Sequence, residues 1–294
     1  MRPLHILLAV CVAAVWGFNF VAIKVGLRDF PPLLFTALRF ALAALPLLVF
    51  GVRGGPPVAW RYVLGIGLVL GALQFALLFG GMHVGMPAGL TSLVAQSQAF
   101  FTVLFAAVLL GDRPGWRPLA GMAVAFAGIA VIALEMPAGG SRLGLAMVVG
   151  AAVAWGAGNI ILKQARAPDL FRLMLWVSLV PPLPLLALSL VVEGPERMAG
   201  ALSGLTWPGV ASLVYIAAAA TLFGFASWGF LMRHYPASLV APFSLLVPIF
   251  GMSSGALLLG EAFGPLKLLG AALVFAGLAV TVLKLPVRKP APAE

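Results

Sequence analysis

The sequence predicts an all-α membrane protein of ten transmembrane helices, arranged as two inverted five-helix repeats with both termini cytoplasmic. Of the 294 residues, 63% are apolar and 9% are charged, whereas a soluble domain carries about 25% charged residues. Apolar stretches of about 17 to 25 residues, the length that crosses a bilayer, recur along the chain. Sequence motifs of the first half recur in the second half, which predicts a duplication.

Each predicted span is an apolar run between short loops rich in glycine, proline or charge. The spans are Leu4–Lys24, Pro32–Phe50, Tyr62–Met82, Ala88–Leu110, Pro118–Leu134, Leu143–Leu162, Leu170–Val192, Pro208–Met232, Ala237–Leu259 and Leu266–Leu283. We expect one repeat over residues 1–137, a second over 138–285, and a polar tail over 286–294. The first run has the positive start of a signal peptide, but its length and its recurring motif favour a retained helix.

The orientation follows from the excess of Lys and Arg on the cytoplasmic side of membrane proteins. With both termini inside, twelve of the eighteen Lys and Arg residues lie on the cytoplasmic side and five outside, while Arg39 falls within a span. The net charge of +10 comes from residues scattered singly between apolar runs, so we expect no nucleic-acid partner. Cys11 is the single cysteine, which excludes an intrachain disulfide and a cysteine-based metal site.

Two sets of motifs recur between the halves. Trp16-Gly17, Asn19 and Lys24 in the first span match Trp155-Gly156, Asn159 and Lys163 in the sixth, with the asparagine shifted by one place. Leu109–Asp112 and Leu258–Glu261 are followed, at equal spacing, by Gly121 and Gly128 and by Gly270 and Gly277. Composition alone can produce similar helices, but a duplication is favoured. Five spans in each copy would invert the second copy in the membrane.

These motifs, with Leu38-Arg39-Phe40 in the second span, resemble the EamA-type branch of the drug/metabolite transporter superfamily over essentially the whole chain. Within it, the chain is most similar to bacterial amino-acid exporters of the YddG and cysteine-exporter kind. The resemblance implies a secondary transporter of the bacterial inner membrane that exports aromatic or other neutral amino acids and related metabolites by alternating access. Asp112 departs from the family in replacing the commoner glutamate, and Arg39 has no basic partner in the seventh span.

The candidate substrate-binding residues are polar and aromatic residues within the spans. A polar side chain within the membrane is energetically costly, so its presence suggests a function. They are Trp16, Asn19, Gln74, Phe79, His83, Gln96, Gln98, Phe101, Trp155, Asn159, Phe243 and Ser244. Amide groups beside aromatic rings suit a zwitterion with an apolar side chain. Hydrogen bonding between packed helices is the alternative role for the polar members.

Three cations of the spans are open to two interpretations. Arg39 lies about seven residues inside the second span and is able to meet a substrate carboxylate. Because the resemblance places that span at the periphery, a structural role that bonds backbone carbonyls or loops is favoured. Lys24 and Lys163 lie at helix ends, where extension toward the interface is favoured over substrate contact.

No carboxylate falls in the middle of a span, although proton-driven carriers usually hold one there. We therefore predict facilitated transport or exchange of an amino acid. Export of drugs or other small metabolites is the alternative, but a lipophilic cation would favour a membrane carboxylate. Paired acids, a histidine cluster and a P-loop are missing from the sequence, so we expect no catalytic residue, metal or cofactor, and neither an enzyme nor a scaffold. We expect the protein to work as a monomer in the lipid bilayer.

Glycine and proline predict packing and motion. The glycines at 121, 128, 270 and 277 should let the fifth and tenth spans pack closely between the halves, with oligomer contacts as the alternative. Gly111 and Gly260 should end their helices, and the acid after each should cap the next helix. Pro242 and Pro248 are candidate hinges, because proline removes a helix hydrogen bond.

Overall fold

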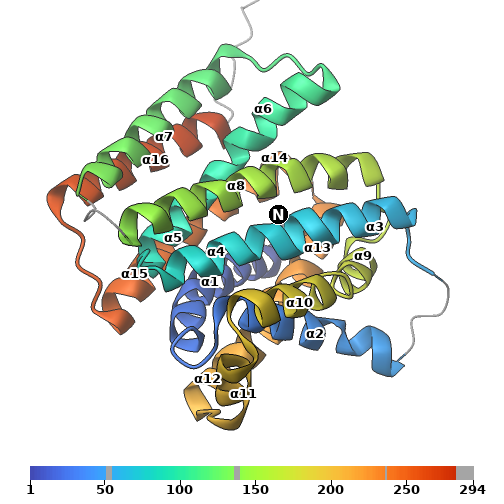
Figure 1. Ribbon diagram of the computed structural model, residues 1–294. Helices are drawn as coiled ribbons and strands as arrows, with labels where there is room; N and C mark the ends of the chain where they lie inside the picture. Colours follow the sequence, from blue (N-terminus) through green and yellow to red (C-terminus); the bar gives the residue numbers. More distant parts are fainter. Residues whose placement is uncertain (51–54, 136–139, 236, 283–294) are drawn as a thin grey trace, which may run out of the picture.

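The computed structural model describes residues 1–50, 55–135, 140–235 and 237–282. All regular secondary structure in these ranges is helical (Figure 1). Nine helical segments of the described part are long and apolar enough to cross a membrane, and the last apolar helix is shorter. The predicted all-α class is confirmed. The predicted tail, residues 286–294, lies outside the described residues, as does the predicted boundary between residues 137 and 138.

Five predicted spans are continuous helices whose bounds lie within three residues of the prediction. They are α1 (Pro3–Gly26), α2 (Pro32–Phe50), α7 (Trp116–Glu135), α8 (Gly140–Ala165) and α16 (Pro265–Val282). Leu283, the predicted end of the last span, lies outside the described residues. The long apolar runs of these spans explain the agreement, since an isolated apolar helix satisfies all its backbone groups internally.

The other predicted spans are helices with interruptions. The third is α3 (Trp60–Ile66), the π-helical turns η1 (Gly67–Leu73) and α4 (Gln74–His83). The eighth is α12 (Trp207–Val214), the π-helical η3 (Tyr215–Phe223) and α13 (Gly224–His234). The fourth is α5 (Ala88–Val94), the 3₁₀ turn η2 (Ala95–Ser97) and α6 (Gln98–Leu110). The ninth is α14 (Ala237–Val240), the 3₁₀ turn η4 (Ala241–Leu245) and α15 (Leu246–Leu259). The interruptions thus recur in pairs, one in each half.

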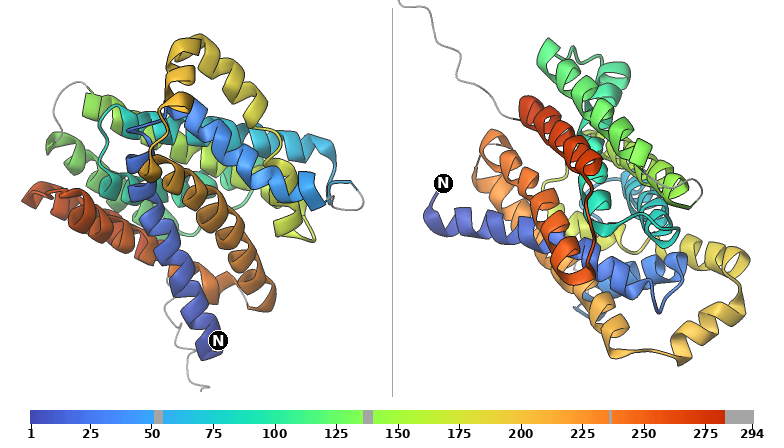
Figure 2. Two further views of the ribbon diagram at one scale, coloured as in Figure 1. Left: turned by 90° about the horizontal axis from the view of Figure 1, so that it is seen from below. Right: turned by 90° about the vertical axis from the view of Figure 1, so that its left-hand side faces the viewer.

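The seventh predicted span is broken, and a further helix follows it. α9 (Leu170–Val177) and α10 (Pro182–Val192) are separate helices, because Pro182 lacks an amide hydrogen and favours the first turn of a new helix. A short helix that the sequence did not predict, α11 (Pro195–Ser203), lies between α10 and α12. It projects away from the other helices in both views of Figure 2.

Glycines bring α7 and α16 together, as predicted. The two helices lie side by side (Figures 1 and 2). A Cβ atom on Gly128 would lie 2.6 Å from the carbonyl oxygen of Gly270, and one on Gly270 would lie 2.7 Å from that of Gly128. Such an approach of two backbones is possible only without side chains. The predicted contact between the fifth and tenth spans is confirmed.

The glycine of each Trp-Gly motif marks an equivalent contact in the two halves. α1 packs against α15, and α8 packs against α6. A Cβ on Gly17 would meet the Cβ of Phe250 and lie 2.7 Å from the carbonyl oxygen of Val247, whereas one on Gly156 would lie 2.7 Å from the Cβ of Phe101. The sequence repeat is therefore also a repeat of packing.

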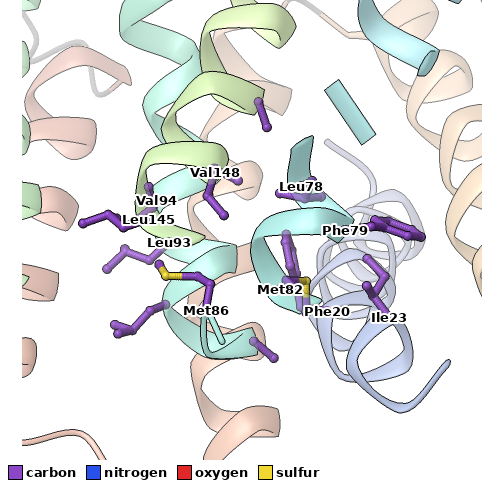
Figure 3. Packing of buried hydrophobic residues seen from close by; sticks show 14 of the residues in the cluster. Phe20, Ile23, Leu78, Phe79, Met82, Met86, Leu93, Val94, Leu145 and Val148 are labelled. Atoms are coloured by element: carbon purple, nitrogen blue, oxygen red, sulfur yellow. The ribbon is translucent and has the colours of Figure 1, made fainter. Parts of the chain in front are cut away.

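The largest apolar cluster joins helices from both halves (Figure 3). Phe20 and Ile23 of α1 lie near Phe79 and Met82 of α4, and Val148 of α8 belongs to the same cluster. All five side chains are at most 6% exposed. This packing closes the interior of the bundle beside the C-terminal halves of α1 and α4.

Three glutamates cap helices that belong to the opposite half. The Glu193 carboxylate accepts from the amides of Leu33 and Leu34 at the start of α2, at 2.7 and 3.1 Å. Glu135 accepts at 2.8 Å from the amide of Lys267 in the first turn of α16. Each carboxylate satisfies amides that have no partner within their own helix.

Glu261 corrects one prediction. Gly111 and Gly260 end α6 and α15 in the left-handed conformation, with φ of 70° and 66°, as predicted. The acid after Gly260 was expected to cap the next helix, α16, but Glu261 accepts from the amides of Ala88 and Gly89 at the start of α5, at 2.6 and 2.8 Å. α15 packs against α5, and this contact places the Glu261 carboxylate at the start of α5 instead of α16.

Candidate functional site

A polar cluster joins α6 of the first half to α8 of the second half. The Asn159 Nδ2 atom donates to Gln98 Oε1 at 2.8 Å and to Thr102 Oγ1 at 3.0 Å. Thr102 also donates to the backbone carbonyl of Gln98 at 2.8 Å. All three side chains are half-buried. Helical periodicity explains the geometry, since Gln98 and Thr102 are four residues apart and share one face of α6.

The cluster retains hydrogen-bonding groups that no described residue uses. Among the described residues, the Gln98 amide nitrogen, the Asn159 amide oxygen and the Trp155 indole N–H make no hydrogen bond. Trp155 lies one helical turn before Asn159 on α8 and is half-buried. Two donors and an acceptor therefore lie close to one aromatic surface.

Gln96 connects the two 3₁₀ interruptions. Its Nε2 atom donates to the backbone carbonyl of Ser244 at 3.3 Å, which links η2 to η4. Phe101, on the next turn, packs against Phe126 of α7 with the ring centroids 5.5 Å apart. Pro242 lies within η4 and Pro248 within α15, so both candidate hinges lie beside or within this linked region.

The matching motif on α1 is engaged differently. The Trp16 Nε1 atom donates to the carbonyl oxygen of Ala220 in η3 at 2.9 Å. Its ring packs against Phe225 and Trp228 of α13, at centroid distances of 5.7 and 5.2 Å. Asn19, on the following turn, is 7% exposed, and its Oδ1 atom has no hydrogen-bond partner in the described part of the chain. Within the described residues, the indole N–H of Trp16 is thus hydrogen-bonded and that of Trp155 is not.

Arg39 also reaches η3. It is 3% exposed, and its Nε and Nη2 atoms donate to Thr221 Oγ1 at 3.1 and 3.0 Å. Its guanidinium carbon lies 3.9 Å from the centroid of the Phe75 ring, a cation–π contact. The Nη1 atom has no hydrogen-bond partner among the residues that the structure describes. Arg39 was expected to bond backbone carbonyls or loops. Instead it bonds the side-chain hydroxyl of a residue in the other half, because η3 packs against α2.

The remaining candidates lie elsewhere in the bundle. Phe79 is fully buried in the apolar cluster, His83 is exposed at the end of α4, and Phe243 packs against the cluster formed by Ala9, Leu231 and Val240. Gln74 is 1% exposed, and neither polar atom of its amide has a hydrogen-bond partner within the described ranges. Lys24 was expected to extend toward the interface, but in the structure it donates to the backbone carbonyl of Met82 at the end of α4, at 2.8 Å.

Sequence reasoning did not select Thr102 or Thr221 as site residues. Thr221 follows four alanines and is the one polar residue of its nine-residue π-helical segment apart from Tyr215, so its isolation was the available signal. Thr102 lies four residues after Gln98, and that spacing was its signal.

Comparison with known proteins gives a consistent result. The model of the EamA-like transporter family matches the chain twice, over residues 3–134 and 142–283. Probable amino-acid metabolite efflux pumps of Escherichia coli and Salmonella typhimurium are each 42% identical to it, over 289 and 291 residues. These alignments cover 96% and 97% of the chain and 96% of each relative.

A probable terminal-alkyne amino-acid exporter of Streptantibioticus cattleyicolor is 31% identical, over 91% of the chain and 90% of that protein. A protein of known crystal structure has a TM-score of 0.61 and 22% identity, over 96% of the chain and 97% of its own. At this identity, the likeness concerns the fold alone.

Proposed function

Because the chain belongs to the EamA-like transporter family, with the family domain present twice, we propose that it exports aromatic or other neutral amino acids and related metabolites. It is a multi-pass protein of the bacterial inner membrane. Its relatives are named as transporters and efflux pumps, which favours transport over enzymatic turnover.

The proposed architecture has ten spans, with α16 as the tenth, in two inverted repeats over residues 1–137 and 138–285. Its support is the double family match together with the paired π-helical and 3₁₀ interruptions. With both termini cytoplasmic, the end of the molecule at which Glu135, Glu193 and Glu261 cap helix N-termini faces the outside of the cell. The Lys163–Asp112 pair, at 3.0 Å, then lies on the cytoplasmic side, and so does the tail over residues 286–294.

The polar cluster carries the substrate proposal. A free amide N–H₂ on Gln98 can donate to a carboxylate, while the Asn159 amide oxygen can accept from an ammonium group. The Trp155 ring offers a surface for an aromatic or other apolar side chain. Asn19, Gln96, Phe101 and Ser244 extend the proposed site toward the other half, and Trp16, Gln74, Phe79, His83 and Phe243 complete the candidate set.

Transport by this site requires that its two sides open in turn. The proposed motion rocks one repeat against the other, with bending at Pro242 and Pro248. Facilitated transport or exchange fits the sequence, which places no carboxylate in the middle of a predicted span. A drug or other metabolite as cargo is the second candidate, and the protein is proposed to act as a monomer.

The decisive experiment is counterflow in liposomes that hold purified protein and one unlabelled amino acid at a time. We expect saturable uptake of a labelled neutral amino acid, reduced at least about tenfold in Gln98→Ala and Asn159→Ala by loss of hydrogen bonds to a charged group. Ser253→Ala is the control, because Ser253 is exposed on α15. Absence of uptake for every amino acid tested would transfer the proposal to another metabolite.

A further inference from the structure

A groove outside the polar cluster runs between the first turn of α3 and the last turn of α8. These two helix ends lie at the same end of the molecule (Figure 1). The groove has a volume of about 820 Å³ and is lined by Arg61, Tyr62, Gly65, Ile161, Gln164 and Arg166. Gly65 and Ile161 bring the two helices into ordinary van der Waals contact there, since a Cβ added to Gly65 would lie 3.4 Å from the Ile161 side chain.

Two arginines give the groove a strong positive charge. The Arg61 Nη2 atom donates to the Tyr62 hydroxyl at 3.3 Å, and its guanidinium lies 4.9 Å from the Tyr62 ring centroid. Arg166 follows the end of α8 with φ of 48°, the only non-glycine residue at positive φ in the described ranges. Within those ranges, no carboxylate pairs with either guanidinium. The two guanidinium groups are therefore available to bind an anion.

The groove continues into an apolar surface. Leu64 and Leu68, three and seven residues after Arg61, lie on the same face of the third span. They are 47% and 46% exposed. A ligand that binds the arginines can therefore also contact apolar surface toward the middle of the membrane.

The groove faces away from the polar cluster. At 100° per residue, Ile161 lies about 200° and Gln164 about 140° around α8 from Asn159. Its ligand is thus reached from the lipid side of the bundle, which separates it from the transported substrate.

We propose that this groove binds an anionic phospholipid. The headgroup phosphate accepts from Arg61 and Arg166, since the planar guanidinium matches phosphate oxygens bidentately, and the Tyr62 and Gln164 side chains complete its surroundings. The acyl chains lie along Leu64 and Leu68. The proposed orientation assigns the lipid to the cytoplasmic leaflet, but binding itself does not depend on the orientation or on the proposed function.

The test measures lipid binding by the purified full-length protein in detergent, by native mass spectrometry with phosphatidylglycerol and phosphatidylcholine as probes. We expect phosphatidylglycerol to bind more tightly, and Arg61→Gln/Arg166→Gln to weaken it about 10- to 30-fold, as expected for two interfacial cations. Arg113→Gln/Arg233→Gln removes the same charge from two exposed arginines outside the groove and should bind like the parent.

Three results would overturn the proposal. They are equal binding of the two lipids, equal loss in both double variants, and displacement of phosphatidylglycerol by inorganic phosphate at equal concentration. Displacement of that kind would identify a free-phosphate site. Arg61→Lys/Arg166→Lys keeps the charge if the glutamine variant fails to fold; it should retain selectivity for phosphatidylglycerol but bind more weakly than the parent, because lysine lacks the planar fork.

Discussion

Trp16 and Trp155 occupy the same place in the two repeats and differ in their bonding. Trp16 donates to the Ala220 carbonyl of a π-helical segment, whereas Trp155 has no hydrogen-bond partner among the described residues. π-Helical segments often mark functional positions in membrane and soluble helices.

Trp16→Phe tests the indole hydrogen bond. The variant keeps the ring contacts with Phe225 and Trp228 and loses the bond, so we expect about 0.5–1.5 kcal/mol lower stability. Thermal unfolding in detergent measures it. Trp155→Phe is the matched control, and we expect it to leave the unfolding midpoint unchanged. Equal loss in both variants would contradict this assignment.

Thr221→Val tests the anchoring of Arg39. The variant leaves a buried cation without its hydrogen-bond acceptor, which costs about 1.5–3 kcal/mol. Arg39→Met removes the cation itself, and Thr221 keeps its bond to the Ile216 carbonyl at 2.8 Å, so we expect a smaller loss. Comparing unfolding midpoints checks the order, and a larger loss in Arg39→Met would refute it.

The candidate site could be predicted in part. Trp155 and Asn159 are four residues apart, as are Gln98 and Thr102, so spacing along each helix is enough to place each pair on one face. The bond from Asn159 to Gln98 joins residues 61 positions apart, and no local pattern encodes it. The exposure of His83 was likewise not predictable from sequence, because the end of a helix is exposed or enclosed according to its neighbours.

At the scale of helices, close contacts follow the repeated glycines. Gly17 and Gly156 lie where α1 and α8 touch α15 and α6. The recurrence of Trp-Gly predicted the duplication, but not which helices these two glycines would contact. The sequence did not indicate the interruptions η1 and η3, since neither contains proline and a π-helical turn has no clear composition signal.

Gly156→Ala tests the contact of α8 with α6. The new methyl group would lie 2.9 Å from the backbone carbon of Phe101 and from the Thr102 nitrogen, so backbone must shift, at a cost of about 1–3 kcal/mol. We expect a lower unfolding midpoint and less folded protein in the membrane. Gly200→Ala on α11 is the control, because no atom lies within 4 Å of its added Cβ. Equal behaviour of the two variants would count against a tight contact.

At the scale of the molecule, glutamates of each half cap the N-termini of helices in the other half. Composition predicted the membrane class, and the repeated motifs predicted a duplication. The partners of Glu193 and Glu261 were not predictable, because a carboxylate in a loop can cap whichever helix the fold brings near it. Packing between distant parts of the chain places Glu193 at the start of α2 and Glu261 at the start of α5.

Glu261→Ala tests this coupling. It removes the acceptor of the Ala88 and Gly89 amides, and an N-terminal cap contributes about 0.5–2 kcal/mol. We expect faster hydrogen exchange of amides at the start of α5 and a lower unfolding midpoint. Glu196→Ala, which changes an exposed glutamate in the first turn of α11, should alter neither. Unchanged hydrogen exchange of the α5 amides in Glu261→Ala would show that Glu261 does not stabilise the start of α5.

The caps also bear on the order of biosynthesis. α2 and α5 leave the ribosome 160 and 173 residues before the glutamates that cap them, so both helices enter the membrane with unfinished ends. α16 meets the opposite situation, since Glu135 is already in place 132 residues earlier. The caps of α2 and α5 can therefore form only after Glu193 and Glu261 of the second half have been synthesised.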